Sequence, residues 1–387
     1  MNLRPRIYLD HAATSWPKSE AVIDAMNRYV QSCGAAAGRG AYHAAAEADG
    51  IVSMVRRDIA ALIHAADSHS ISFHSNGTTA LNAAIHGVLR TGDHVVVSAA
   101  EHNSVLRPLH DLREQQKIEL TIVPVDQQGV VSAQQVLSAV TKSTKLVALT
   151  HASNVTGAIQ PVEAVAEGMR QCKGHLLVDA AQTFGVCEID VSMGIDLLAA
   201  AGHKASAGPL GTGFLYVEPG IHDEVLPLFH GGTGSRSESL AMPASMPAKL
   251  EAGNLNVHAL AGWAAALREL RDEGVERRSE ISRELAHLLH EGLAGLSHVR
   301  VFGKPEALAT ASILIDDLAP ADTAAILDAE FGVETRAGWH CAALIHGYLG
   351  SEPQGTLRIS AGHTTTADEI ANAVAAVGQV ARTIHSH

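Results

Sequence analysis

The sequence predicts an α/β protein in which a mostly parallel, seven-stranded sheet is covered by helices on both faces and is followed by a smaller α+β domain. Three observations predict this architecture. From Ile71 onward, short apolar runs alternate with longer amphipathic runs, the order in which strands and helices build a parallel sheet. A segment rich in Gly, Ser and Pro, Gly231–Asn256, then interrupts the alternation. Beyond it, helices and strands follow in a new rhythm to the end of the chain.

Each predicted strand is a short apolar run, and each predicted helix is a longer run with apolar residues at helical spacing. The strands of the sheet are Ile71–His74, His94–Ser98, Leu120–Val123, Lys145–Thr150, Leu176–Asp179, Leu197–Ala200 and Gly213–Val217. The helices between them are Thr78–Leu89, Ser104–Gln115, Ser132–Val140 and Val162–Cys172. In such a sheet the ligand lies beyond the carboxyl ends of the strands.

The second domain is predicted from the segments that flank this sheet. Ile7–Leu9 is strand-like, and His258–Glu273 and Val275–Leu293 have helical patterns. Met242-Pro243 and Met246-Pro247 argue against a helix within the interrupting segment, because the residue before a proline disfavours helical backbone. We therefore expect a large domain over residues 15–257 and a small α+β domain formed by residues 1–14 and 258–387.

Composition and charge exclude several classes of function. The chain has 387 residues, 47% of them hydrophobic, and a formal net charge of −13, which indicates an ordered globule without a basic surface for nucleic acid. The 23 histidines are scattered without HExxH or paired Cys/His spacing, so we expect no metal site. The four cysteines form no CxxC, which favours a reducing compartment. Without a signal-like or membrane-spanning apolar run, we expect a cytoplasmic protein and no membrane contact.

Two ionisable residues follow the ends of two predicted strands. Asp179 ends Leu176–Asp179, and Lys204 follows Leu197–Ala200. Pyridoxal phosphate (PLP) chemistry requires such a pair, because a lysine amine condenses with the aldehyde and an acid keeps the pyridine nitrogen protonated. The spacing alone leaves open an exposed lysine and a helix-capping aspartate.

The segments around both residues resemble those of the class-V aminotransferase family, which are fold-type I PLP enzymes. Gly202-His203-Lys204, followed by Gly208–Gly213, resembles the segment of the cofactor lysine, and Val178–Gln182 resembles the segment that binds the ring nitrogen. Four further segments resemble family motifs in the same order along the chain: Leu9–Thr14, Ser75–Asn82, Ala100–Ser104 and Thr150–Gly157. The resemblance extends from about Ile7 to the last helix.

The resemblance implies a role for each matching residue. Lys204 would be the Schiff-base lysine and general base, and Asp179 the partner of the ring nitrogen. The other implied cofactor residues are Thr78, Thr79 and His203 at the phosphate, Asn154 and Gln182 at the ring oxygen, and His102, which stacks on the ring and shuttles protons. A helix that opens with a glycine and two threonines suits an anion, since its N–H groups and dipole face it. For each His or Thr taken alone, packing or helix capping is the alternative.

The loop Thr335–Ala343 indicates the type of reaction. It resembles the Arg-x-Gly-x-His-Cys-Ala loop of cysteine desulfurases of the SufS-like group. In that family a cysteine thiolate takes the sulfur of the substrate as a persulfide and leaves alanine. The resemblance implies that Cys341 is this nucleophile and that Arg336 and His340 favour its thiolate. A lone cysteine in such a loop is otherwise usually inert.

Two further residues are implied in substrate binding. Arg358, within Gly355–Ser360, resembles the arginine that binds the substrate carboxylate, for which a planar guanidinium offers a two-pronged match. A surface arginine that ends a strand is the alternative. His43 is expected to line the same pocket.

The sequence therefore predicts a homodimeric cysteine desulfurase or a closely related selenocysteine lyase, with L-cysteine or L-selenocysteine as substrate and a sulfur-acceptor protein as partner. A C–S β-lyase or an aminotransferase that does not use Cys341 is the alternative enzyme. A non-catalytic sulfur carrier is the alternative outside catalysis. The acceptor and its pathway, iron–sulfur cluster assembly included, stay open.

Three residues depart from the family pattern. Asn254 follows Glu251-Ala252-Gly253 where the family often has a threonine that reaches the phosphate of the neighbouring subunit. An amide can still donate a hydrogen bond, so Asn254 is expected to bind the cofactor in this way. Trp339 replaces a smaller or polar residue and is expected to narrow the pocket. Ala201 stands where many members have a small hydroxyl residue.

Overall fold

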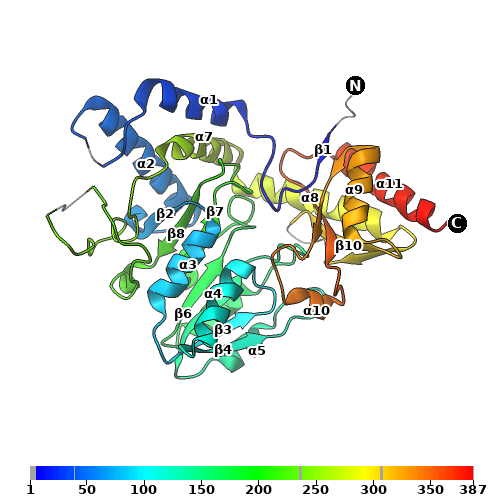
Figure 1. The fold of residues 1–387 in the computed structure, drawn as a ribbon, viewed down its shortest axis with the longest axis horizontal. Helices are drawn as coiled ribbons and strands as arrows, with labels where there is room; N and C mark the ends of the chain where they lie inside the picture. Colours follow the sequence, from blue (N-terminus) through cyan, green and yellow to red (C-terminus); the bar gives the residue numbers. More distant parts are fainter. Residues whose placement is uncertain (1–5, 39, 235–237, 306–307, 387) are drawn as a thin grey trace.

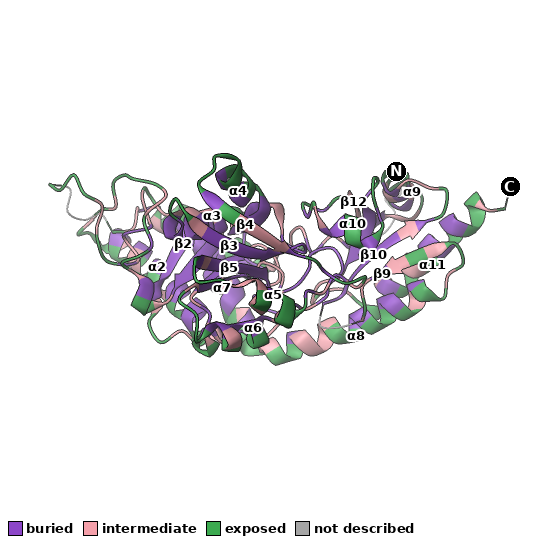
Figure 2. Cartoon of the chain, turned by 90° about the horizontal axis from the view of Figure 1, so that it is seen from below, coloured by how far each residue is buried: buried purple, intermediate pink, exposed green. Residues whose placement is uncertain are grey.

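The computed structural model describes residues 6–38, 40–234, 238–305 and 308–386. Figure 1 shows a large domain built on a central sheet and a smaller domain beside it, which contains both ends of the chain. Figure 2 shows that the strands are mostly buried, whereas α8 and α11 have exposed outer faces.

The central sheet confirms the predicted fold class. Its strands are β2 (Ile71–His74), β3 (Asp93–Ser98), β4 (Ile118–Val123), β5 (Thr144–Thr150), β6 (His175–Asp179), β7 (Leu197–Ala201) and β8 (Gly213–Val217). Their order in the sheet is β2-β8-β7-β6-β5-β3-β4. The strands from β7 to β4 run parallel, and β8 is antiparallel to both of its neighbours.

Both faces of this sheet are buried, because successive residues of a strand point to opposite sides. On β6, Leu177 packs into a core with α3 (Gly77–Val88) and α4 (Asn103–Glu114). The adjacent Val178 packs into the core on the other face. The helices of that other face are α2 (His43–Leu62), α5 (Ala133–Ala139), α6 (Val162–Met169) and α7 (Val257–Glu273), with α1 (Glu20–Arg28) against α7. Short helical turns lie at Tyr29–Cys33, Ser68–Ser70, Val191–Met193 and Pro219–Ile221.

The small domain has an antiparallel sheet of four strands in the order β12-β13-β10-β9. The strands are β9 (Val299–Phe302), β10 (Thr310–Ile315), β12 (Arg336–Gly338) and β13 (Thr356–Ser360). β1 (Ile7–Tyr8) pairs in parallel with β11 (Val333–Glu334). The helices are α8 (Val275–Ala294), α9 (Pro320–Phe331), α10 (Ile345–Leu349) and α11 (Ala367–Ile384). Leu9 joins the core of this domain, as expected for the N-terminal segment.

The structure differs from the expected domain boundary at residue 257. α7 packs on α1 and α2, and its buried Trp263, Leu267 and Leu270 belong to the core of the large domain. The core of the small domain begins with Leu285 on α8. The change from strands to helices after residue 256 therefore marks the last helix of the large domain, and the division between the domains falls at the start of α8.

The segment Gly231–Asn256 has no helix or strand among its described residues. Part of this segment, residues 235–237, lies outside the described residues. Its Leu240 is fully exposed.

Within the described ranges, no helix is long and apolar enough to cross a membrane.

Candidate active site

The carboxyl edge of the central sheet holds one pocket in which most of the predicted cofactor residues meet. β6 ends there with Asp179, β7 leads into Lys204, and α3 and α4 begin there. The pocket is lined by Asn76, Gly77, Thr78, Leu81, His102, Ser104, Thr150, Asn154, Asp179, Ala181, Gln182, Ala201, His203 and Lys204. The parallel strands explain the convergence, because their carboxyl ends share one edge of the sheet.

Lys204 lies in a turn that returns from β7 toward β8. The Gly202 N–H donates to the Thr212 carbonyl over 2.9 Å, and the Gly208 N–H donates to the Gly202 carbonyl over 2.8 Å. Burial lowers the pKa of Lys204 to about 8, against the opposite effect of Asp179. Among the described residues, its Nζ has no hydrogen-bond or ion-pair partner. The amine is therefore available to react, and much of it is neutral near pH 8.

Asp179 is 5% exposed at the end of β6. Its Oδ1 accepts the Ala181 N–H over 2.9 Å. Burial raises the pKa of Asp179, while that hydrogen bond and the charge of Lys204 act in the opposite direction. A buried carboxylate that lacks a salt bridge gains most from a cationic N–H placed in the pocket, as a protonated pyridine nitrogen would be.

Beside Asp179 lies a second buried acid, Glu101, which the sequence analysis did not single out. Its Oε1 accepts the Ser98 hydroxyl over 2.5 Å and the Thr150 N–H over 3.0 Å, and its Oε2 is buried without a partner. Burial raises the pKa of Glu101 to about 8, with Asp179 contributing in the same direction. Glu101 is thus mostly neutral at pH 7, which spares the site a second buried negative charge.

The N-terminus of α3 forms the other end of the pocket. Asn76 caps the helix through the Thr79 N–H over 2.9 Å, and the N–H groups of Gly77 and Thr78 have no partner within the helix. His203 lines the same region, with a buried Nδ1 that has no partner. Burial lowers the pKa of His203 to about 4, so the ring is neutral. Free N–H groups at a helix N-terminus favour an anion.

Thr78 and Thr79, both predicted to bind the phosphate, face different pockets. Thr78 lines the pocket of Lys204, and its hydroxyl lies 2.7 Å from that of Ser104. The Thr79 hydroxyl instead donates to the Asn76 carbonyl over 2.9 Å, and this residue lines a separate pocket together with Asn254. The capping box of α3 thus uses the hydroxyl that the resemblance assigned to the phosphate.

His102 is oriented by the first turn of α4. Its Nδ1 accepts the Ser104 N–H over 3.0 Å and lies 2.8 Å from the Ser104 hydroxyl. Burial lowers the pKa of His102 to about 4. Since Nδ1 accepts a backbone N–H, the proton of the neutral ring is on Nε2. Ser104 was quoted within a motif but given no role, and the structure shows that it joins His102 to Thr78.

Asn154 and Gln182 line the pocket as expected, and each also holds another part of the chain. The Asn154 Nδ2 donates to the His340 carbonyl over 2.6 Å, and the Gln182 Nε2 donates to the Ala12 carbonyl over 3.1 Å. The two amides therefore connect the large domain with the loop of Cys341 and with the N-terminal segment.

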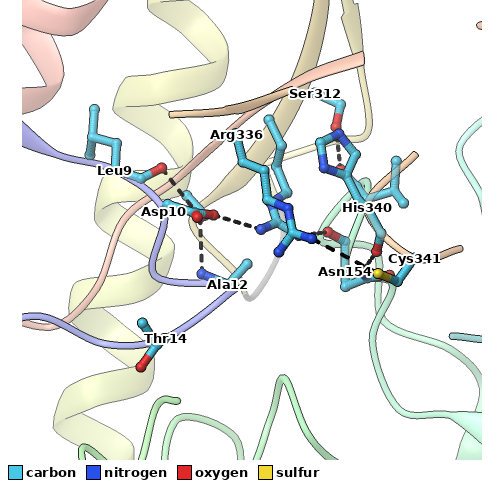
Figure 3. Close-up of polar contacts among 12 residues, drawn as sticks. Leu9, Asp10, Ala12, Thr14, Asn154, Ser312, Arg336, His340 and Cys341 are labelled. Atoms are coloured by element: carbon cyan, nitrogen blue, oxygen red, sulfur yellow. Dashed lines mark hydrogen bonds and ion pairs between the residues drawn. The ribbon is translucent and has the colours of Figure 1, made fainter. Parts of the chain in front are cut away.

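Cys341 follows β12 of the small domain and lies beside Asn154, which lines this pocket (Figure 3). The residue is exposed, and its Sγ lies 3.9 Å from Nη2 of Arg336. Its carbonyl accepts the Asn103 N–H over 2.7 Å at the start of α4. The thiol is close enough to Lys204 to influence the pKa of that amine. The arrangement places a nucleophile beside a guanidinium at the edge of the pocket.

The structure contradicts the expectation that His340 favours the thiolate. His340 is 3% exposed, and its Nε2 donates toward Thr356, 3.0 Å from the carbonyl and 2.9 Å from the hydroxyl. Burial lowers the pKa of His340 to about 2, so the ring carries no positive charge. The ring fixes the loop on β13, and Arg336 is left as the cation beside Cys341.

Arg358 lies on β13 directly opposite Arg336 on β12. It is 1% exposed, which excludes the alternative of a surface arginine. Its Nη2 donates to Asp10 Oδ1 over 2.7 Å, its Nη1 donates to the Asn154 carbonyl over 3.0 Å, and its Nε is buried without a partner. Two facing guanidinium groups, of which only Arg358 is paired with a carboxylate among the described residues, favour a further anion.

Three other residues of the sequence analysis lie elsewhere. His43 is exposed at the first residue of α2, and Asn254 lines the separate pocket with Thr79; neither lines the pocket of Lys204. The indole of Trp339 is 40% exposed and packs edge-on against His346, so it does not line that pocket. Ala201 does line it, next to Gly77.

The residues of this pocket fit PLP. The buried Nδ1 of His203 and the free N–H groups of α3 suit a phosphate, Asp179 suits the protonated ring nitrogen, and the unpaired amine of Lys204 suits the aldehyde. Asn154 and Gln182 offer N–H groups between these two ends. The donor set thus matches the anionic, aromatic and carbonyl parts of one molecule.

Comparison with known proteins agrees with this geometry. Residues 7–372 match the family Aminotransferase class-V. A probable cysteine desulfurase of Methanothermobacter thermautotrophicus is 35% identical over 375 residues, which cover 95% of this chain and 93% of that protein. A probable cysteine desulfurase of Synechocystis is 30% identical over 386 residues, which cover 96% of this chain and 90% of that protein.

Solved structures are similar over the same extent. The apo structure of a cysteine desulfurase from Thermococcus onnurineus has a TM-score of 0.91 at 29% identity, covering 98% of this chain and 95% of that one. A cysteine desulfurase of Escherichia coli, solved with an S-sulfonic acid, has a TM-score of 0.88 at 28% identity, with the same coverage. Since the family match spans nearly the whole chain and the relatives are covered almost in full, this chain belongs to the class-V aminotransferase family.

Proposed function

We propose that this chain is a PLP-dependent cysteine desulfurase that converts L-cysteine to L-alanine and takes the sulfur onto Cys341 as a persulfide. One observation carries the proposal. An amine without a polar partner, Lys204, and a buried acid, Asp179, share a pocket at whose edge an exposed thiol, Cys341, lies beside a guanidinium. The names of the relatives support the same reaction.

The large domain would hold the cofactor and control the protons. PLP supplies an aldehyde that condenses with an amine and a ring that accepts electron density from the substrate Cα. Asp179 would hold the ring nitrogen protonated, and α3 and His203 would bind the phosphate. Lys204, with its pKa lowered to about 8 by burial, removes the Cα proton once its amine is free. The proton on Nε2 of His102 is placed for transfer within the same pocket.

The small domain would supply the groups that handle sulfur and the substrate carboxylate. The Cys341 thiolate attacks the substrate sulfur, the carbon–sulfur bond breaks, and a sulfur–sulfur bond forms on Cys341. The electron pair of the broken bond stays with carbon, which takes up protons and leaves as alanine. Arg336 stabilises the thiolate through its Nη2, 3.9 Å from Sγ, and Arg358 binds the carboxylate.

The chain would act as a homodimer. Phe229, Leu210 and Leu240 are exposed by 58%, 66% and 109%, and Phe229 lines the pocket that contains Thr79 and Asn254. Apolar side chains at such positions suit a subunit interface. In a dimer, Asn254 would reach the phosphate of the neighbouring subunit, which accounts for its position away from Lys204 of its own chain. The four free cysteines support a reducing, cytoplasmic location.

Product analysis of a Cys341→Ala variant tests the proposed reaction. The variant keeps Lys204, Asp179 and Arg358, so it should bind PLP and L-cysteine. Alanine formation from L-cysteine should fall by at least about a hundredfold, because no nucleophile takes the sulfur. L-Selenocysteine should lose less, because the carbon–selenium bond is weaker.

A matched control is Cys172→Ala, which removes an exposed thiol far from the pocket and should leave both activities unchanged. Alanine formation at the wild-type rate in Cys341→Ala would exclude Cys341 as the acceptor. Pyruvate and ammonia as the products of the wild-type protein would instead identify a C–S β-lyase.

A further inference from the structure

The N-terminal segment from Asp10 to Ser15 crosses from the small domain to the large one and contacts three groups of the site in order. Asp10 binds Arg358, the Ala12 carbonyl accepts Nε2 of Gln182, and Ser15 donates its N–H to the His203 carbonyl over 2.9 Å. Figure 3 shows Asp10 next to Ala12, with its side chain directed toward the region of Arg336. Of these three contacts, only the one between Asp10 and Arg358 joins two charged groups.

The backbone around Asp10 is fixed against β13. The Ser360 N–H donates to the Leu9 carbonyl over 2.8 Å, and the His11 N–H donates to the Ser360 carbonyl over 3.2 Å. The Asp10 carbonyl also lies 3.2 Å from the Tyr8 hydroxyl. Asp10 is therefore held on both sides along the chain, and its carboxylate has a defined position relative to Arg358, two residues before Ser360.

Arg358 depends on this carboxylate for its orientation. Its guanidinium is buried, and burial lowers the pKa of Arg358 while Asp10 acts in the opposite direction. Arg336 faces it across β12 and β13, so a like charge acts from the other side. Of the two hydrogen bonds that hold the guanidinium, the one to Asp10 is the only one to a charged partner. Without it, the guanidinium would keep only the neutral carbonyl of Asn154 as an anchor.

We propose that Asp10 is a positioning residue for substrate binding, which holds the Arg358 guanidinium so that its remaining N–H groups meet the substrate carboxylate. This rests on the proposed function, in which Arg358 binds that carboxylate. Asp10 itself contacts neither the substrate nor the sulfur. Since the carboxylate is bound equally before and during the reaction, loss of Asp10 should raise KM and leave kcat largely unchanged.

The test compares two amines that differ in the carboxylate. L-Cysteine has one, and cysteamine lacks it. Dissociation constants are measured on the PLP-loaded protein from the change in cofactor absorbance, which requires binding but no turnover. In Asp10→Asn, which keeps the shape of the side chain and removes its charge, the dissociation constant and KM for L-cysteine should rise about ten- to hundredfold. The constant for cysteamine should change less than about threefold, and so should kcat for L-cysteine.

Two further variants give the control and the partial rescue. Asp24→Asn changes an exposed aspartate of α1 and should leave every constant at its wild-type value. Asp10→Glu keeps the charge, and its dissociation constant for L-cysteine should lie between those of the wild type and of Asp10→Asn. If Asp10→Asn does not fold, Asp10→Glu is compared with the wild type instead.

Equal weakening of L-cysteine and cysteamine binding in the Asp10 variants would mean that Asp10 only supports the fold. Unchanged L-cysteine binding would mean that Asp10 does not orient Arg358 for the substrate carboxylate. Either outcome overturns the proposal. A wild-type protein that binds L-cysteine but forms no alanine would refute the proposed reaction alone, because the binding comparison does not depend on turnover.

Discussion

On the large-domain side of the pocket His102, His203 and Glu101 are held neutral by burial, whereas on the small-domain side two guanidinium groups lie near one thiol. Burial lowers the pKa values of His102 and His203 to about 4 and raises that of Glu101 to about 8. Arg336 and Arg358 instead lie opposite each other, and Asp10 pairs with Arg358. Proton transfer needs groups that can change charge, and binding a carboxylate or a thiolate needs groups that cannot.

The largest expected effect tests the buried side. Lys204→Ala should lose PLP attachment and lower turnover by about three orders of magnitude or more. Borohydride treatment of the wild type followed by peptide mass spectrometry should find PLP on the peptide that contains Lys204. The peptide that contains Lys18 is the comparison, because burial lowers the pKa of this lysine to about 8 as well. Unlike Lys204, however, Lys18 already donates from its Nζ to Ser15 and to the His203 carbonyl. PLP fixed on Lys18 would mean that a lowered pKa, without an open pocket, selects the lysine.

A smaller effect is expected on the charged side. In Arg336→Gln, alkylation of Cys341 by iodoacetamide should slow about tenfold at low salt, because the cation 3.9 Å from Sγ no longer attracts the negative charge of the attacking sulfur. At high salt the difference between variant and wild type should shrink. Alkylation of the exposed Cys172 provides the internal reference. A rate at Cys341 that does not respond to the substitution would show that the guanidinium does not activate the thiol.

The smallest expected effect concerns stability and pH. The folded protein holds a proton on Glu101 up to about pH 8, whereas an unfolded chain releases it near its ordinary value of 4.5. Between these values the folded state binds more protons, so the free energy of unfolding falls as pH rises, by at most about 1.4 kcal/mol per pH unit. Glu101→Gln should flatten this slope in urea unfolding between pH 5.5 and 7.5. An unchanged slope would place the titrating group elsewhere.

The central sheet could be predicted from the sequence because its strands are mostly apolar runs, each found within two residues of its predicted ends. α1 and α2 were not predicted, and α7 was assigned to the wrong domain, since its helical pattern does not reveal which core its buried face joins. The positions of Lys204 and Asp179 followed from strand ends, and their roles followed from the family resemblance. Asp10 did not, because its partner Arg358 lies 348 residues away and only the folded chain brings them together.

His340 illustrates a second limit of prediction from the sequence. Adjacency to Cys341 in the chain indicated a cation beside the thiol, but both residues have positive φ angles, 49° for His340 and 57° for Cys341, and this turn points the two side chains apart. The conformation is rare for residues other than glycine and depends on contacts such as those of His340 with Thr356 and Asn154.

If Cys341 takes the sulfur, the hydrogen bond between its carbonyl and the Asn103 N–H would limit how that sulfur leaves the protein. It joins the backbone of the nucleophile to the first residue of α4, and the adjacent His340 is held by Asn154 and Thr356. With the backbone held in this way, a sulfur atom bound to Cys341 would move mainly by rotation of the Cys341 side chain. The loop would not extend outward with the sulfur, so an acceptor would have to place its own thiol at the edge of the pocket. We expect acceptors of this chain to present that thiol on a protruding segment.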